Sequence, residues 1–105
     1  MNESFEMKEP KYLEVFHAAQ AKLLEGDFEA GREFLAQAAT LVEDLDDRDF
    51  LEYIKGTQAY LEQDRESLKL AIGQIQEPHN KALLERFLFT LESGEQVDYN
   101  RDYMG

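Results

Sequence analysis

Glu14 and His17 lie three positions apart, a spacing that places a carboxylate and an imidazole on one face of a helix. Di-iron helical bundles use two Glu-x-x-His pairs together with two further carboxylates. This chain has one such pair, because Gln76 stands three positions before the other histidine, His79. We therefore predict no metal site here and interpret Glu14 and His17 as an ordinary surface pair, with a metal-binding bundle as the alternative.

The stretch "EDLDDRD" gathers four aspartates at positions 44, 46, 47 and 49. A helix–loop–helix calcium site requires Gly at the sixth position of its loop and Glu at the twelfth. Counted from Asp44, these positions hold Asp49 and Lys55, so the calcium pattern fails. The cluster predicts a solvated acidic turn, in which one of the aspartates caps the following helix.

Residues typical of catalysis are scarce in this chain. It has no Cys and two His, and it contains neither a Gly-rich phosphate loop nor a Gly-x-Ser-x-Gly turn. Ser4, Ser67 and Ser93 have no histidine near them in sequence, although a pairing between distant residues stays open because catalytic triads assemble in space. We expect a protein that is not an enzyme and that uses no cofactor.

The elements that would position any site are helices. Residues 1–9 are polar and are expected to be flexible, and Pro10 then suits the first turn of a helix. Gly26 is typical of a helix end, and Asp27 can cap the next helix, so "EGDFE" predicts an antiparallel hairpin. The first helix carries its apolar residues at helical spacing: Tyr12, Val15, Phe16, Ala19 and Leu23.

Further apolar stripes of helical period follow over residues 31–45, 50–61, 68–75 and 82–91. Pro78 opens the last of these helices and Gly94 closes it. Residues 95–105 show no helical period and are expected to form a flexible acidic tail, with docking of this tail into the protein's own groove or into a partner as the alternative. The sequence thus predicts an all-α fold with five helices in one domain, residues 10–94.

The two halves of this domain repeat with a period of 37 residues. A repeat of this length, with one helical hairpin in each unit, favours a helical solenoid. Gln63 stands next to Asp64 in the second unit as Gly26 stands next to Asp27 in the first. The matching pairs are Phe16 and Tyr53, Ala19 and Gly56, Leu24 and Leu61, Asp27 and Asp64, Glu29 and Glu66, Leu35 and Ile72, and Ala38 and Ile75.

The first hairpin, about residues 12–43, resembles a tetratricopeptide repeat. The segment "EGDFEAGREFLAQAATL" is similar to that family's Gly-Asp-aromatic turn followed by small residues seven positions apart, here Gly31 and Ala38. The second hairpin departs from the pattern, because Arg65 replaces the turn aromatic and Leu68 replaces a small residue. The resemblance implies two stacked antiparallel hairpins with a C-terminal capping helix, and a closed up-down helical bundle is the alternative.

In tetratricopeptide proteins the first helix of each hairpin lines a concave face that holds an extended peptide or a partner helix. The resemblance implies a partner-binding set in which large aromatic side chains serve as anchors, while Gln20 and Thr57 bond a peptide backbone. Aromatic stripes also suit core packing, which is the other interpretation of the same residues. The set is Leu13, Phe16, Gln20, Leu23, Phe50, Tyr53, Thr57 and Tyr60.

The net charge of −12 and a pI near 4.4 limit the partners. Such a surface repels phosphate, so we expect neither direct nucleic-acid binding nor association with anionic membranes. No apolar run would span a bilayer and no secretory signal opens the chain, so a cytoplasmic location is expected. We predict an adaptor or chaperone that binds a basic or amphipathic peptide, with an acidic mimic that blocks a nucleic-acid-binding protein as the alternative. A homodimer stays open, and exposure of Leu83 or Phe89 would indicate its surface.

Overall fold

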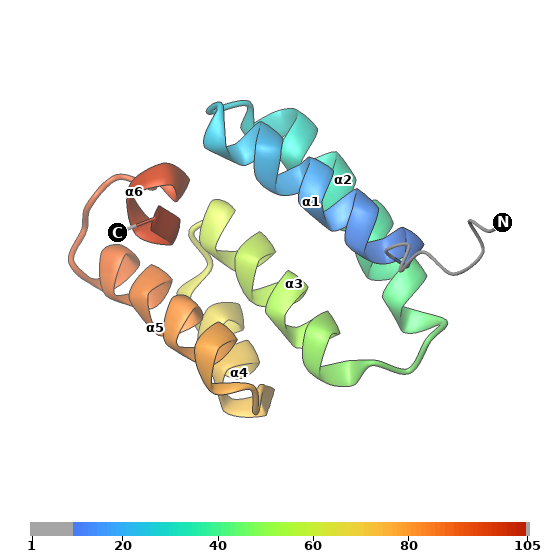
Figure 1. Ribbon diagram of the computed structural model, residues 1–105. Helices are drawn as coiled ribbons and strands as arrows, with labels where there is room; N and C mark the ends of the chain where they lie inside the picture. The colour runs from blue at the N-terminus through green and yellow to red at the C-terminus, as the bar shows by residue number, and fades with distance from the viewer. Residues whose placement is uncertain (1–9, 105) are drawn as a thin grey trace, which may run out of the picture.

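The structure is a computed structural model that describes residues 10–104 (Figure 1). The described residues form six helices and no strand, so the all-α prediction is confirmed, while the expected count of five omits the last helix. The predicted flexible segment 1–9 lies outside the described residues. The helices are α1 (Lys11–Leu24), α2 (Phe28–Glu43), α3 (Arg48–Leu61), α4 (Arg65–Gln74), α5 (Pro78–Glu92) and α6 (Tyr99–Met104).

Three aspartates start the helices that follow the short connections. Asp27, Asp47 and Asp64 each accept a hydrogen bond from the backbone N–H three residues ahead, at 3.2, 3.2 and 3.1 Å, and so cap α2, α3 and α4. The two hairpin turns reverse through left-handed residues, Gly26 at φ 89° and Gln63 at φ 58°. The matched positions in the sequence therefore adopt matched backbone conformations, although only one of them is glycine.

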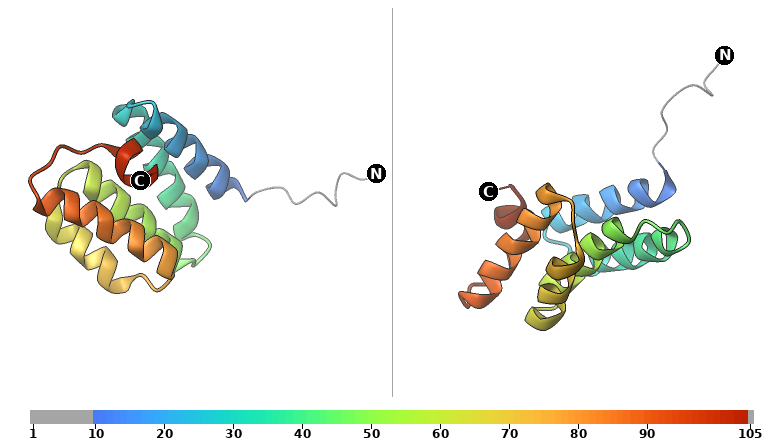
Figure 2. Two further views of the ribbon diagram at one scale, coloured as in Figure 1. Left: turned by 60° about the vertical axis from the view of Figure 1, so that its left-hand side comes forward. Right: turned by 90° about the horizontal axis from the view of Figure 1, so that it is seen from below.

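The five long helices form a stack in which each packs against its neighbours in the chain (Figures 1 and 2). The carboxyl-terminal ends of α1, α3 and α5 point toward the same end of the molecule. Within residues 10–104, the backbones of α1 and α5 do not approach each other closely, and α6 lies between them and packs on both. The arrangement is therefore a row of helices that α6 bridges at one end, and α1 does not pack directly on α5.

An aromatic cluster joins the two hairpins near the amino-terminal ends of α1 and α3. The ring of Phe16 lies 5.1 Å from that of Phe50 and 5.4 Å from that of Tyr53, and Tyr12 lies 5.3 Å from Phe50. Edge-to-face pairs of this kind contribute about 0.5–1.5 kcal/mol each beyond their apolar burial. The cluster therefore fixes the way in which the second hairpin stacks on the first.

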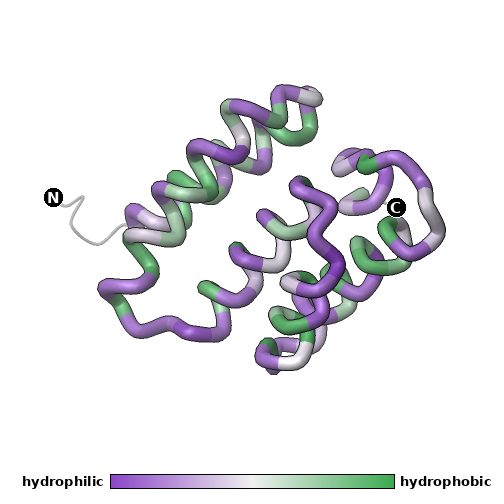
Figure 3. The backbone as a smooth tube through the Cα atoms, turned by 180° about the vertical axis from the view of Figure 1, so that it is seen from behind, coloured by the Kyte–Doolittle hydropathy of each residue, from purple (hydrophilic) through white to green (hydrophobic). Residues whose placement is uncertain are grey.

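Two glycines allow close helix packing. A Cβ atom at Gly31 would stand 2.4 Å from the side chain of Leu23, and one at Gly56 would stand 2.6 Å from that of Leu84. The small positions noted in the sequence thus lie where α2 meets α1 and where α3 meets α5. Figure 3 shows apolar and polar segments alternating along the helices, as expected when each helix buries one stripe. Among the described residues, no helix combines the length and the apolar character that a membrane span requires.

Candidate functional site

The segment 95–104 was expected to be flexible, but the structure forms α6 within it and seats this helix across the carboxyl-terminal ends of α1, α3 and α5 (Figures 1 and 2). Tyr99 and Asp102 are 1% and 4% exposed, so this helix is part of the packed structure. We call the residues that receive it the α6-binding surface: Gln20, Leu24, Tyr60, Arg86, Phe87 and Thr90.

The centre of this contact is a buried carboxylate. The hydroxyl of Tyr60 donates a hydrogen bond to Oδ2 of Asp102, and the hydroxyl of Thr90 donates to the same oxygen at 2.8 Å. Arg101 donates from Nε to Oδ1 at 2.9 Å and from Nη2 to Oδ2 at 3.2 Å. Arg86 adds a bond of 3.3 Å to the backbone carbonyl of Asp102. Side chains of α3, α5 and α6 therefore converge on one residue.

These partners decide the charge state of the site. Burial by itself would raise the pKa of Asp102, but the hydrogen bonds from Arg101, Tyr60 and Thr90 outweigh it, and the pKa is lowered. Burial raises the pKa of Tyr60, and the hydrogen bond to Asp102 raises it further. At neutral pH the carboxylate is thus ionised while the phenol keeps its proton and can donate it.

Tyr99 provides the aromatic half of the contact. Its ring lies 5.9 Å from the ring of Phe87, which is itself stacked on Tyr60 at 4.2 Å. Nε2 of Gln20 donates to the Tyr99 hydroxyl at 3.3 Å, so α1 also holds this side chain. Burial raises the pKa of Tyr99, although the bond from Gln20 acts in the opposite direction. Tyr99 and Asp102 are three positions apart, and both therefore face the same surface.

Local sequence signals explain why α6 forms where it does. Asp98 accepts a hydrogen bond from the backbone N–H of Arg101 at 3.0 Å, as a helix cap does, and its own N–H donates to the Tyr60 hydroxyl at 2.9 Å. Tyr99 and Tyr103, four positions apart, stack with ring centroids at 5.3 Å. An isolated helix of this length is marginal in water, so its formation depends on the surface that receives it.

The structure separates the predicted partner-binding residues into two groups. Leu13, Gln20 and Phe50 are partly exposed. The remaining five are buried in this arrangement, so with α6 docked their side chains do not reach solvent. Their exposed fractions are 3% for Phe16, 1% for Leu23, 4% for Tyr53, 1% for Thr57 and 0% for Tyr60.

The two residues that were expected to bond a peptide backbone are already engaged. Thr57 donates its hydroxyl to the carbonyl of Tyr53 at 3.0 Å, one helical turn back, and so serves its own helix. Gln20 donates to the Tyr99 hydroxyl and therefore does bond a chain segment, although it is the tail of the same protein. Tyr60 likewise reaches α6 through Asp102.

Sequence reasoning missed Arg86, Thr90 and Asp102 as site residues, and it considered Tyr99 only as part of a tail that could dock. Thr90 and Arg86 lie on a helix that was assigned only a capping role, and no motif marks them. Signals did exist in the tail, since an aspartate stands before Tyr99 and a second tyrosine follows at helical spacing. The pattern is one turn long, too short to be recognised as a helix from periodicity alone.

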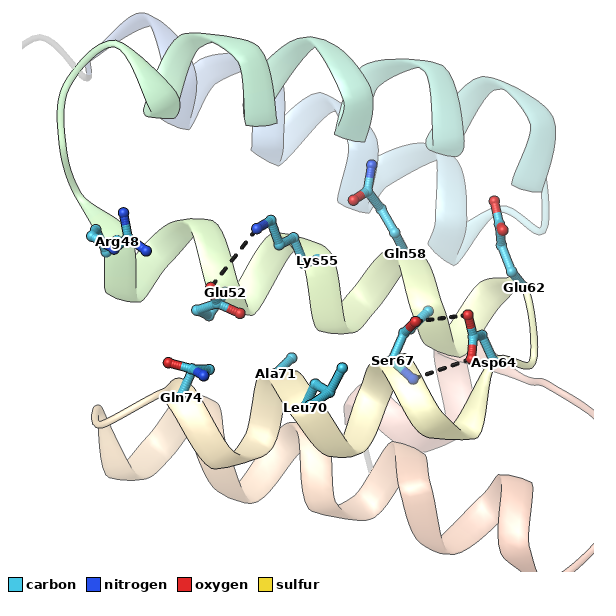
Figure 4. A pocket seen from close by; sticks show the side chains of 11 residues that line it. Arg48, Glu52, Lys55, Gln58, Glu62, Asp64, Ser67, Leu70, Ala71 and Gln74 are labelled. Atoms are coloured by element: carbon cyan, nitrogen blue, oxygen red, sulfur yellow. Dashed lines mark hydrogen bonds and ion pairs between the residues drawn. The ribbon is translucent and has the colours of Figure 1, made fainter.

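A second concave region runs along α3 and α4 and is shown in Figure 4. It is an open hollow of about 590 Å³ that shares no residue with the α6-binding surface. Lys55 pairs with Glu52 at 3.9 Å within it, and the 68%-exposed Leu70 stands on its wall. Charges of both signs line this hollow together with Leu70 and two alanines, and the charged groups do not converge on a common point.

The residues first considered for metal chemistry have other roles. Glu14 pairs with Lys11 at 4.0 Å on the surface. Asp47 caps α3, and Asp49 accepts hydrogen bonds from the backbone N–H groups of Gln76 and Glu77 at 2.6 and 3.2 Å, which ties α3 to the connection before α5. Across residues 10–104 the structure brings no three potential His, Asp or Glu ligands together in a metal-binding group.

Comparison with known proteins gives no relative: the sequence matches no family model, and neither the curated proteins nor the solved structures gave a match.

Proposed function

We propose that this protein is a non-enzymatic interaction module of the tetratricopeptide-like kind, which binds a short amphipathic helical segment of a partner protein at the carboxyl-terminal ends of α1, α3 and α5. The observation that carries the proposal is α6 itself. This helix is less than two turns long, and yet the surface buries the side chains of Tyr99 and Asp102. The surface also donates hydrogen bonds to the carboxylate of Asp102. A surface that holds one such segment has the shape and the donors to hold another.

The helix seated there is amphipathic, which defines the kind of partner. Tyr99 and Asp102 are buried, whereas Asn100, Arg101 and Met104 face solvent. The net charge of −12 would in addition attract basic residues that flank the bound segment in a partner. The proposed binding site therefore combines polar and aromatic contacts with a surrounding negative electrostatic potential.

Affinity purification followed by binding measurements with the purified partner tests this function. In a chain whose α6 is kept from docking by Tyr99→Ala and Asp102→Ala, we expect the further substitutions Gln20→Ala and Arg86→Ala to weaken partner binding by about tenfold or more, because they remove two donors at the edges of the α6-binding surface. The matched control is Leu70→Ala with Lys55→Ala, which alters the separate hollow along α3 and α4 and should leave the affinity unchanged. The proposal would be overturned if only the control substitutions, Leu70→Ala with Lys55→Ala, weakened partner binding.

The net charge supports a second candidate, an acidic mimic that occupies the nucleic-acid site of a basic protein. This function depends on long-range electrostatics and does not need the α6-binding surface. Its affinity would therefore fall steeply with added salt and would tolerate Gln20→Ala, Arg86→Ala. A competition assay between the protein and DNA for the captured partner, run at two salt concentrations, separates the two functions.

A further inference from the structure

We propose that the α6-binding surface recognises partner segments in which an aromatic residue is followed three positions later by a carboxylate, and that α6 is the built-in competitor for this site. The inference rests on the proposed function and adds to it the chemistry of the ligand and a means of control. The segment of the chain that occupies the surface supplies the pattern, with Tyr99 as the aromatic residue and Asp102 as the carboxylate.

The donors on the surface require an acceptor from the ligand. The hydroxyls of Tyr60 and Thr90 both point at one oxygen of Asp102, and burial together with this contact raises the pKa of Tyr60 so that its proton stays in place. A ligand without an oxygen at this point would leave buried donors unsatisfied, which is costly. A carboxylate meets both donors at once, and charge-assisted hydrogen bonds are the stronger kind.

The residue that precedes the carboxylate in the chain is positively charged. Arg101 precedes Asp102 in the chain, lies on the exposed side of α6 and donates to both carboxylate oxygens. From the surface itself, Arg86 adds a bond to the backbone carbonyl. A basic residue next to the carboxylate therefore belongs to the recognised pattern, and it reconciles an acidic motif with a protein of net charge −12.

The aromatic residue is fixed by a separate set of contacts. Phe87 lies against the ring of Tyr99, and Gln20 from α1 donates to its hydroxyl. An aromatic side chain with a hydrogen-bond acceptor at its tip satisfies both contacts, which favours tyrosine. Residues three positions apart share a helix face, so a single turn of helix presents both groups to α3 and α5.

The competition follows from the way in which α6 is attached. The connecting segment, residues 93–98, tethers it to α5, and a short tether corresponds to an effective concentration in roughly the millimolar range. Because such a short helix is unstable by itself, it exists in the docked form or unfolds, and a partner gains access when it unfolds. A partner must therefore bind more strongly than a tethered copy of the same pattern.

A fluorescently labelled peptide of residues 95–105 tests the inference against the full chain. The receptor is the double variant Tyr99→Ala, Asp102→Ala, whose tail can no longer dock while its surface stays intact. We expect this variant to bind the peptide saturably in an anisotropy titration, and the wild-type chain to bind it at least about tenfold more weakly because its own α6 competes. The variant carrying Asp102→Asn alone should fall between the two.

Altered peptides test the recognised pattern. A peptide with Asp102→Asn or Tyr99→Ala should lose about tenfold or more in affinity, while one with Met104→Ala, at a position that is 68% exposed in the chain, should bind as the parent does. Adding Tyr60→Phe and Thr90→Val to the Tyr99→Ala, Asp102→Ala receptor should abolish the preference for Asp over Asn. Equal binding of all these peptides would overturn the proposed pattern.

Three further results would count against the inference. If the folded Tyr99→Ala, Asp102→Ala variant does not bind the peptide at millimolar concentration, the proposed binding site does not exist. If the variant and the wild-type chain bind the peptide equally well, α6 does not compete for the site. A wild-type dimer in light scattering that disappears in the variant assigns the surface to α6 of a second copy instead of a partner. In each of these cases the proposed function would still hold if Gln20→Ala, Arg86→Ala weakened partner binding. The partner segment would then have a different sequence pattern.

Discussion

The two ends of the helix row are held together by different chemistry. Near the amino-terminal ends of α1 and α3, Phe16, Phe50 and Tyr53 meet ring against ring with centroids 5.1 to 5.8 Å apart. At the carboxyl-terminal ends, α6 bridges α1 and α5 through Asp102 and Tyr99. We call these the aromatic seam and the polar seam.

The difference determines which contact can open. Apolar burial does not depend on direction or on protonation, so the aromatic seam is expected to open only when the whole domain unfolds. The polar seam depends on the geometry and the charge of a few groups, and it holds a helix too short to persist when undocked. We therefore expect the aromatic seam to be the more stable of the two contacts, while the polar seam carries the element that can exchange.

The largest expected effect comes from removing a ring of the aromatic seam. Phe16→Ala should lower the free energy of unfolding by about 3–5 kcal/mol, because it deletes a side chain that is 3% exposed and leaves a cavity between the hairpins. Urea denaturation followed by circular dichroism measures the change. Leu70→Ala, at a surface position, should alter it by less than about 0.5 kcal/mol. A loss of under about 1 kcal/mol for Phe16→Ala would show that the seam does not hold the hairpins together.

Breaking the polar seam should have a smaller and more local effect. Asp102→Asn removes the charge that Arg101, Tyr60 and Thr90 hydrogen-bond, at a cost of about 1–3 kcal/mol to the docking of α6. Hydrogen exchange measured by NMR should show faster exchange of the α6 amides and unchanged exchange in α1 to α3. Met104→Ala is the matched control within the same helix. Equal loss of protection throughout the chain would show that the two seams open together.

Acid should open the polar seam before the aromatic one. The pKa of Asp102 in the folded protein lies below its ordinary value of 3.8, so its contribution to docking is complete above about pH 4. It is lost as the pH falls from there through the depressed pKa, because the docked form must then give up its ionised carboxylate. NMR signals of Tyr99 followed from pH 6 to pH 2 should report this release. In Asp102→Asn the same signals should show no such step, and an identical step in both would contradict the assignment.

Removing a cap beside the aromatic seam tests whether the ends are independent. Asp47→Ala deletes the acceptor of the Phe50 backbone N–H and should lower the free energy of unfolding by about 1 kcal/mol. The polar seam lies at the other end of α3, so the docking equilibrium of α6 should stay the same. Accelerated exchange confined to the α6 amides in this variant would show that the two seams are coupled.

The smallest expected effect is a gain of stability at the turn between α3 and α4. Gln63 adopts a positive φ of 58°, where a side chain is unfavourable, and Gly26 takes the equivalent place in the first hairpin. Gln63→Gly should raise the free energy of unfolding by about 0.5 kcal/mol, after the greater backbone entropy of unfolded glycine is subtracted. Thermal unfolding detects the change as a higher Tm, and a lower Tm would show that the Gln63 side chain makes a stabilising contact.

The sequence by itself determined the local structure of this protein. Apolar residues at a period of 3.6, the aspartate caps and the turn positions Gly26 and Gln63 all act within a few residues, so they predicted five of the six helices and the connections between them. The 37-residue spacing paired Asp27 with Asp64, and both prove to be caps. Composition likewise limited the chemistry, because a chain without Cys cannot build thiolate sites.

Only the tertiary structure decided which aromatic residues are core and which segment fills the surface at the helix ends. Phe16 and Tyr53 suit an exposed groove as well as a buried seam, because a helical stripe does not show what covers it. The helix α6 depends on Gln20, Tyr60 and Thr90, which precede Asp102 by 82, 42 and 12 residues. A single helical turn has too little local free energy to be predicted alone, and its stability comes from groups that folding brings together.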